Sequence, residues 1–173
     1  MRIAVIGNSG GGKSVLARRL AFELRLPCVE VDCLQWLPGW TLAPATSFDQ
    51  EHARAIAGDR WVVEGLGART SLPARLQRAT HIVLIDMPLW VHFWLAAERH
   101  IAWNAGRLEH PPAGSTEPPP LGALFRTIAE VDRDWMPEMR KLAEAEEHAG
   151  KRVVRMLSYE ALTSFSSVLL TAS

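Results

Sequence analysis

The chain has 173 residues, 48% hydrophobic and 22% charged, a composition that fits one globular domain and leaves little room for a second. Nineteen basic and nineteen acidic residues cancel, so the charge balance does not suggest a binder of nucleic-acid backbones. The longest strongly apolar stretch, residues 87–97, is far shorter than the ~20 residues of a membrane helix. Cys28 and Cys33 match no redox or zinc spacing, and no secretory pattern opens the chain. We therefore expect a cytoplasmic monomer or homodimer with no membrane partner, and a nucleic-acid partner is disfavoured.

The first predicted element is a strand, Arg2–Ile6, and a glycine-rich loop follows it directly. The loop has the pattern G-x-x-x-x-G-K-S, in the residues Gly7, Asn8, Ser9, Gly10, Gly11, Gly12, Lys13 and Ser14. From Val15 to Leu24 the apolar residues then recur at helical spacing. This strand, loop and helix are the context that a phosphate-binding loop requires, and the alternative is a βα turn that binds nothing.

The composition of this loop suits phosphate chemistry. Glycines let successive backbone N–H groups turn toward phosphate oxygens, and the start of a helix adds a positive dipole end. We therefore expect ATP and Mg²⁺ as cofactors, with Lys13 as a catalytic residue that reaches the β- and γ-phosphates and the Ser14 hydroxyl as a metal ligand. The remaining predicted nucleotide contacts in the loop are Asn8, Ser9, Gly10, Gly11 and Gly12.

Strands and helices then alternate along the chain. We predict strands at residues 27–32, 60–65, 81–86 and 151–157, and helices at 47–57, 72–79, 88–103, 121–142 and 159–170, with Pro137 kinking or restarting the long one. This order indicates an α/β fold with a five-stranded parallel sheet between two helical layers. Two segments interrupt this alternation. The loop at 34–40 has Trp36 and Trp40 on either side of a Pro-Gly turn, and these rings either pack the loop onto the core or form the wall of a small-molecule pocket. Residues 104–120 hold five of the eleven prolines and are typical of a lid.

Three carboxylates follow predicted strands, where the strand ends of a parallel sheet gather polar side chains. Glu64 is expected to hold the Mg²⁺ shell together with Ser14, and Asp32 to meet an acceptor hydroxyl or phosphate. Asp86 could simply cap the next helix. The six histidines show no ligand spacing and are expected to be structural or exposed.

Arginines provide the cations that phosphoryl transfer needs, because the transition state carries its charge on phosphate oxygens. Arg99 is predicted to be catalytic and to contact the nucleotide, and Arg69 to bind the acceptor. Arg107 and Arg133 are more typical of solvated surface residues, although Arg133 is retained as an acceptor candidate.

Together these segments resemble the adenylate-kinase-related P-loop proteins often labelled DNA topology modulation proteins. The resemblance rests on the phosphate loop, on Asp32 to Trp40, on Arg60 to Gly65 and on Ile85 to Pro88, and it extends from residue 1 to about 142. It implies a nucleoside-monophosphate-kinase fold with sheet order 2-3-1-4-5, an acceptor-binding insertion at about 33–58 and a lid-like excursion at about 104–120. Glu64 then matches an aspartate that adenylate kinases use near magnesium, and Arg99 matches the second of their two arginines before the lid.

Two departures limit what the resemblance implies. The first arginine of that pair, which lies against the nucleotide base in adenylate kinases, is Leu95 here, and Arg69 is one position out of register with their acceptor-phosphate arginine. The favoured function is an ATP- and Mg²⁺-dependent phosphotransferase with a small acceptor. A nucleotide-switched regulatory or DNA-associated protein and a plain NTPase are the alternatives.

Overall fold

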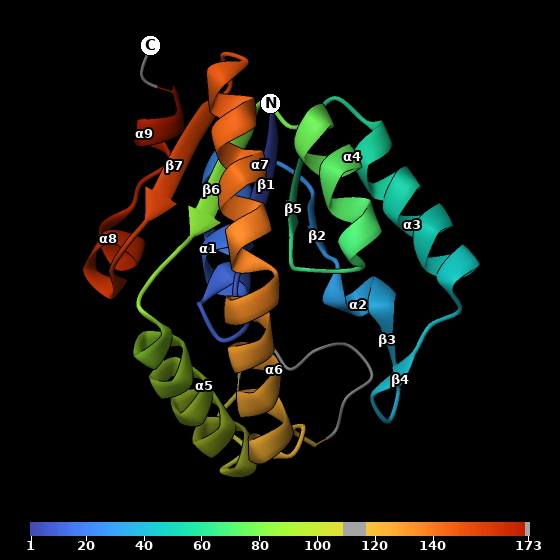
Figure 1. Cartoon of the computed structure of the whole chain (residues 1–173), viewed down its shortest axis with the longest axis vertical. Coiled ribbons are helices and arrows are strands. Elements are labelled where there is room, and N and C mark those ends of the chain that lie inside the picture. The colour runs from blue at the N-terminus through green and yellow to red at the C-terminus, as the bar shows by residue number, and fades with distance from the viewer. Residues whose placement is uncertain (109–116, 172–173) are drawn as a thin grey trace.

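The computed structural model describes residues 1–108 and 117–171 (Figure 1). Its strands are β1 Arg2–Gly7, β2 Cys28–Glu30, β3 Trp36–Leu37, β4 Thr41–Leu42, β5 Trp61–Glu64, β6 His81–Ile85 and β7 Arg152–Met156. Its longer helices are α1 Lys13–Leu24, α3 Ala45–Ala57, α4 Leu72–Arg78, α5 Leu89–Asn104, α6 Leu121–Asp134 and α7 Met136–His148. Shorter ones are α2 Asp32–Gln35, α8 Tyr159–Ser164, α9 Val168–Thr171 and a 3-10 turn, η1, at Arg69–Ser71.

Five strands form one parallel sheet in the order β2-β5-β1-β6-β7. Counted in chain order without the separate β3-β4 hairpin, this order is 2-3-1-4-5, as predicted. β1 is the central strand, where Ala4 pairs with Val63 on one side and with Ile82 on the other. The phosphate loop therefore leaves the sheet at its middle, between the ends of β5 and β6.

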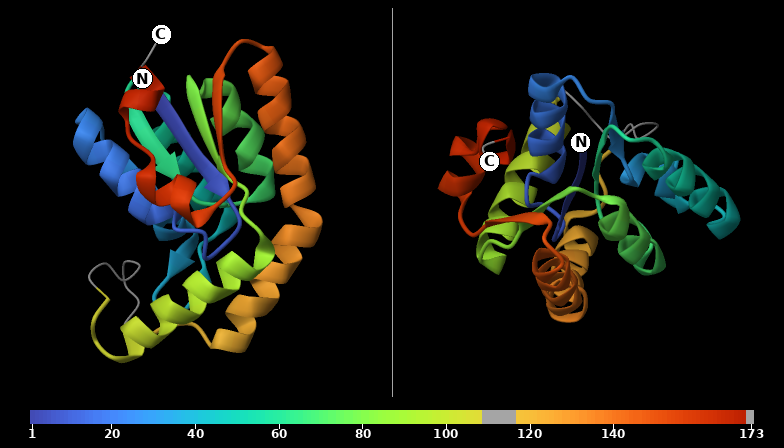
Figure 2. Two further views of the ribbon diagram at one scale, coloured as in Figure 1. Left: turned by 90° about the vertical axis from the view of Figure 1, so that its left-hand side faces the viewer. Right: turned by 90° about the horizontal axis from the view of Figure 1, so that it is seen from above.

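The sheet separates two apolar cores, as expected for a three-layer α/β fold. Side chains alternate along β1, so Ile3 and Val5 join the core beneath α1, α5 and α8, and Ala4 and Ile6 join the core beneath α3, α4 and α7. All four are fully buried. Figure 2 shows the two helical layers on opposite sides of the sheet. The continuous apolar runs of β1 and β6 follow from this double cover.

Two predicted elements differ from the structure, and a third divides where its proline indicated. The second strand ends at Glu30, and the segment after it forms α2 and the antiparallel β3-β4 hairpin where a loop was expected. The long helix is divided at Trp135, which has φ −109° and ψ −37°, and Pro137 lies in the first turn of α7, as its predicted role in restarting the helix requires. The C-terminal helix is two short ones, because Phe165 is extended (φ −62°, ψ 131°). Of the predicted lid, residues 109–116 lie outside the described residues.

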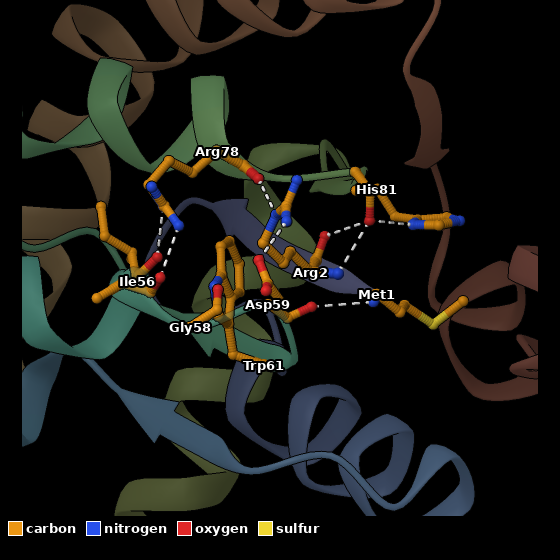
Figure 3. A network of polar contacts seen from close by, with 10 residues as sticks. Met1, Arg2, Ile56, Gly58, Asp59, Trp61, Arg78 and His81 are labelled. Carbon is orange, nitrogen blue, oxygen red and sulfur yellow. Dashed lines mark hydrogen bonds and ion pairs between the residues drawn. The ribbon is translucent and has the colours of Figure 1, made fainter.

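A polar network closes the amino-terminal edge of the sheet (Figure 3). The Met1 amino group donates to the Asp59 carbonyl at 3.1 Å, and the Arg2 guanidinium donates to the Asp59 carboxylate at 3.1 Å and to the Arg78 carbonyl at 2.5 Å. Arg78 in turn donates to the carbonyl of Ile56 at 2.6 Å, at the end of α3. These contacts join the start of the chain to the ends of α3 and α4 at one end of the sheet. The phosphate loop lies at the opposite, carboxyl end.

Candidate nucleotide and acceptor site

The phosphate loop has the backbone that its glycines predict. Gly10 and Gly12 have φ of 74° and 76°, in the left-handed region, and Gly12 is the cap from which α1 begins. A Cβ on Gly10 would lie 2.7 Å from the His92 carbonyl oxygen, so a side chain there would clash with α5. The loop therefore needs glycine both for its turn and for its close packing on α5. This packing places the backbone of residues 8–12 next to the start of α1.

Two buried polar side chains fix the loop from behind. The Asn8 amide donates to the Ile128 carbonyl of α6 at 2.9 Å, and its oxygen accepts from the Ser9 N–H at 2.7 Å. The His92 Nδ1 lies 3.0 Å from the Ser9 carbonyl oxygen. Burial lowers the pKa of His92, although the hydrogen bond that the ring donates to the Ser9 carbonyl oxygen opposes that shift. The Asn8 side chain, predicted to contact the nucleotide, is thus directed into α6 and supports the loop.

Lys13, Ser14 and Glu64 lie together at the carboxyl edge of the sheet. The Ser14 hydroxyl donates to Glu64 Oε1 at 2.9 Å, and Lys13 Nζ folds back to donate to the Asn8 carbonyl at 2.8 Å. Glu64 is 1% exposed. Burial, with a smaller effect of Asp32, raises the pKa of Glu64 to about 7, against the opposing effects of Lys13 and of the Ser14 hydroxyl. Burial also lowers the pKa of Lys13, with Glu64 and Asp32 opposing.

This group of side chains suits the expected cofactors. A hydroxyl and a carboxylate in direct contact are hard oxygen donors of the kind that Mg²⁺ prefers, and a cation beside Glu64 would favour its ionised form. Among the described residues no cluster of three or more His, Cys, Asp and Glu could hold a metal by protein ligands alone. In proteins, Mg²⁺ is commonly bound by one or two side chains together with phosphates and water.

Asp32 and Arg99 reach the same site from two other elements. Asp32 is the first residue of α2, and its Oδ1 would lie 3.4 Å from a Cβ placed on Gly65, the residue after β5. Arg99 is an exposed residue of α5, and its charge interacts with those of Asp32, Glu64 and Lys13. Charged groups from four elements therefore act on one another here: the start of α1, the end of β5, the start of α2 and the second half of α5.

Arg75 is a charged residue of this region that the sequence analysis did not single out. It is fully buried, and its guanidinium donates to the carbonyl oxygens of Gly65 at 2.6 Å and Leu66 at 3.0 Å, which fixes the loop that follows Glu64. Burial lowers the pKa of Arg75 to about 10, while the charges of Glu64 and Asp32 oppose that shift. A signal was present in the sequence, because Arg75 follows Leu72 at helical spacing and so falls on the apolar face of α4.

Arg69 and Arg133 lie in a different group, around the junction of α6 and α7. Arg69 donates to the Glu138 carboxylate at 2.5 Å and to the Asp134 carbonyl at 3.1 Å, and its guanidinium lies 5.9 Å from the centre of the Trp135 ring. Arg133 pairs with the Asp134 carboxylate at 2.6 Å. Both arginines line an open depression of about 660 Å³. The charged groups that most affect Lys13 are Glu64, Asp32, Arg99 and Arg75, so the predicted acceptor arginines are not part of that cluster.

Other residues singled out in the sequence have structural contacts. Asp86 does not cap α5, which has no side-chain cap, and instead receives a bidentate pair from Arg140 of α7 at 2.7 and 2.9 Å. Leu95 packs against the core beneath α1. Arg107 is exposed beyond the end of α5. Of the described histidines, His52 is buried against Phe48 and His81 contacts Leu170, whereas His110 lies outside the described residues.

Comparison with known proteins gives structural neighbours only, since the sequence matches no family model and no curated protein. A Chloroflexus aurantiacus protein that carries a provisional kinase name superposes with a TM-score of 0.55 at 17% identity, over 97% of this chain and 92% of that one. A shikimate kinase from Aquifex aeolicus gives a TM-score of 0.49 at 16% identity, over 99% and 95% of the two chains. A gluconokinase from Sinorhizobium meliloti gives 0.45 at 19% identity, over 81% and 96%. The first of these likenesses shows that the chain shares its three-layer α/β fold with that protein.

Proposed function

We propose that the chain is an ATP- and Mg²⁺-dependent phosphotransferase that moves the γ-phosphoryl group to a small acceptor. The observation that carries this proposal is the Ser14–Glu64 pair beside the phosphate loop, with the charges of Asp32 and Arg99 acting on Lys13 and Glu64. A phosphate loop with a metal site would suffice for hydrolysis. A carboxylate and an arginine from two further elements provide what transfer to a second substrate also needs, a base and an extra cation.

In this proposal the backbone of residues 8–12 holds the β- and γ-phosphates, and Lys13 exchanges its bond to the Asn8 carbonyl for a phosphate oxygen. Ser14 and Glu64 would hold Mg²⁺, which when bound neutralises charge on the phosphate oxygens. Asp32 accepts the proton of the acceptor hydroxyl as its oxygen forms the new P–O bond and the bond to the ADP oxygen breaks. Arg99 stabilises the charge on the moving group.

The whole chain is proposed to act as a single domain, with residues 33–58 as the acceptor-binding insertion. The fold shared with the Chloroflexus aurantiacus protein supports a kinase, and the equal numbers of basic and acidic residues speak against a DNA-associated role, since non-specific binding requires several phosphate contacts. For Arg69 and Arg133 an acceptor role would require release from Glu138 and Asp134. We propose that these two arginines contact the acceptor as it approaches the site, outside the cluster around Lys13.

The test is to follow γ-labelled ATP with a panel of small hydroxyl-bearing acceptors, for wild type, Lys13→Ala and Asp32→Asn. Transfer to an acceptor that both variants lose supports the proposal. Label that passes only to water, at a rate that no acceptor changes, would make the chain an NTPase. No release of label from the wild type would favour a nucleotide-switched regulator.

A further inference from the structure

Three tryptophans form a cluster beside the proposed acceptor site. The rings of Trp36 and Trp40 are 6.0 Å apart and edge to face, and those of Trp40 and Trp103 are 6.3 Å apart and tilted. Trp36 belongs to β3, Trp40 to the turn of the hairpin, and Trp103 to the last turn of α5. Trp103 is 9% exposed, whereas Trp36 and Trp40 are only half-buried. The cluster therefore has a buried floor and two rings that keep part of their surface open.

The cluster has a fixed relation to the two charged residues of the acceptor site. Trp36 caps α2, and its backbone N–H donates to the Asp32 carbonyl, so its Cα lies one helical turn beyond Asp32. Trp103 lies four residues after Arg99 on the same face of α5. Each element thus carries a charged residue and, one turn or ~5 Å further on, a tryptophan of the cluster.

The backbone at Trp40 indicates that its ring has a purpose besides filling space. Its φ is 58°, in the left-handed region, where a bulky residue is an outlier and glycine is normally found. Gly39 beside it already has φ 76°, so the turn uses two consecutive residues of this kind. A tryptophan at a position where glycine would be less strained points to a use of the side chain, whose indole N–H donates to the Glu117 carbonyl at 3.3 Å while its ring contacts the other two.

We propose that Trp36, Trp40 and Trp103 stack against the acceptor and select a hydroxyl-bearing ring with an apolar face. The inference rests on the proposed function, because it places the acceptor hydroxyl at Asp32 and the body of the acceptor one turn away on the tryptophans. Aromatic side chains stack on nucleobases and pack against the C–H faces of sugar rings. An open-chain acceptor has no rigid face to offer, so it gains little from such a site.

The indole N–H signals of ¹⁵N-labelled protein report on this site directly. They are assigned with single Trp→Phe variants and followed while D-glucose, adenosine or glycerol is added, with and without Mg-ADP. We expect glucose or adenosine to shift the signals of Trp36, Trp40 and Trp103, and glycerol to shift none. Trp90, which is 67% exposed near the other end of α5, is the internal control and should not move. Which ring compound acts separates a sugar from a nucleoside as the source of the ring.

Trp40→Gly separates binding from packing, because it removes the ring and also relieves the left-handed backbone. We expect this variant to bind the active ring compound at least tenfold more weakly, equivalent to ~1.4 kcal/mol, with a thermal midpoint close to that of wild type. Trp90→Ala is the matched control and should bind as wild type. Binding unchanged in Trp40→Gly, shifts caused equally by glycerol, or no shift with either ring compound would overturn the inference. Shifts from a ring compound, while no acceptor of the panel receives label from ATP, would instead refute the proposed transfer and leave the ring site standing.

Discussion

Replacing Asn8 with alanine separates a loop support from a nucleotide ligand. The Asn8 side chain is fully buried, donates to the Ile128 carbonyl at 2.9 Å and accepts from the Ser9 N–H at 2.7 Å. Two hydrogen bonds at ~1 kcal/mol each, with some cost for the buried N–H left unpaired, give a loss of about 2–3 kcal/mol in the free energy of unfolding. For a chain of this length that loss lowers the melting temperature by about 4–12 °C.

Urea denaturation of Asn8→Ala measures this loss, and Asn104→Ala, at an exposed position near the end of α5, is the control. ATP affinity, measured by calorimetry well below the melting temperature, should fall by less than tenfold, because the backbone of the loop makes the phosphate contacts. A variant as stable as wild type that no longer bound ATP would refute this interpretation and place the Asn8 side chain on the nucleotide.

Three further predictions concern buried charge, pH and base choice. Arg75→Met should lower the free energy of unfolding by about 2–4 kcal/mol, since it removes charged hydrogen bonds to the Gly65 and Leu66 carbonyls, and a change below ~0.5 kcal/mol in urea denaturation would contradict this. Burial lowers the pKa of His52 from 6.5 to about 4, so below pH 6.5 the folded state binds fewer protons than the unfolded state. Between pH 7 and pH 5 the free energy of unfolding of wild type should therefore fall by up to about 2 kcal/mol more than that of His52→Gln. Parallel pH profiles of the two proteins would rule this out. Because Leu95 packs into the core and offers no guanidinium to stack on a base, ATP should be preferred over GTP by less than roughly a hundredfold, under ~2.7 kcal/mol, and a thousandfold preference by calorimetry would show that other groups read the base.

The sheet and its order could be predicted because they depend on local patterns. The runs at residues 3–6 and 82–85 are apolar throughout, as strands covered on both faces must be, and Pro137 indicated the break between α6 and α7 to within two residues. The β3-β4 hairpin was missed because its strands have only two residues each, too few to show an alternating pattern. No proline or glycine near Phe165 indicated the break between α8 and α9.

The site was predictable only where the spacing of a motif determines the geometry. Ser14 follows from the motif and Glu64 from its place at a strand end, and the two side chains are in direct contact, whereas the cation site they were expected to share stays a prediction. The inward turn of Asn8 depends on a partner 120 residues away in α6, and no local pattern encodes it. The pairing of Arg69 with Glu138 also depends on a partner far away in the chain. The sequence shows that Arg69 follows a strand, but it does not show that the start of α7 packs against this arginine.

The central claim is that the phosphate loop and the Ser14–Glu64 pair form a magnesium–nucleotide site. The direct measurement is a calorimetric titration of ATP into wild type, Lys13→Ala, Ser14→Ala and Glu64→Gln, each with and without Mg²⁺. We expect wild type to bind ATP more tightly with Mg²⁺, Ser14→Ala and Glu64→Gln to lose most of this gain, and Lys13→Ala to lose affinity under both conditions. ATP affinity in the wild type that Mg²⁺ does not change, or that survives in all three variants, would contradict this assignment.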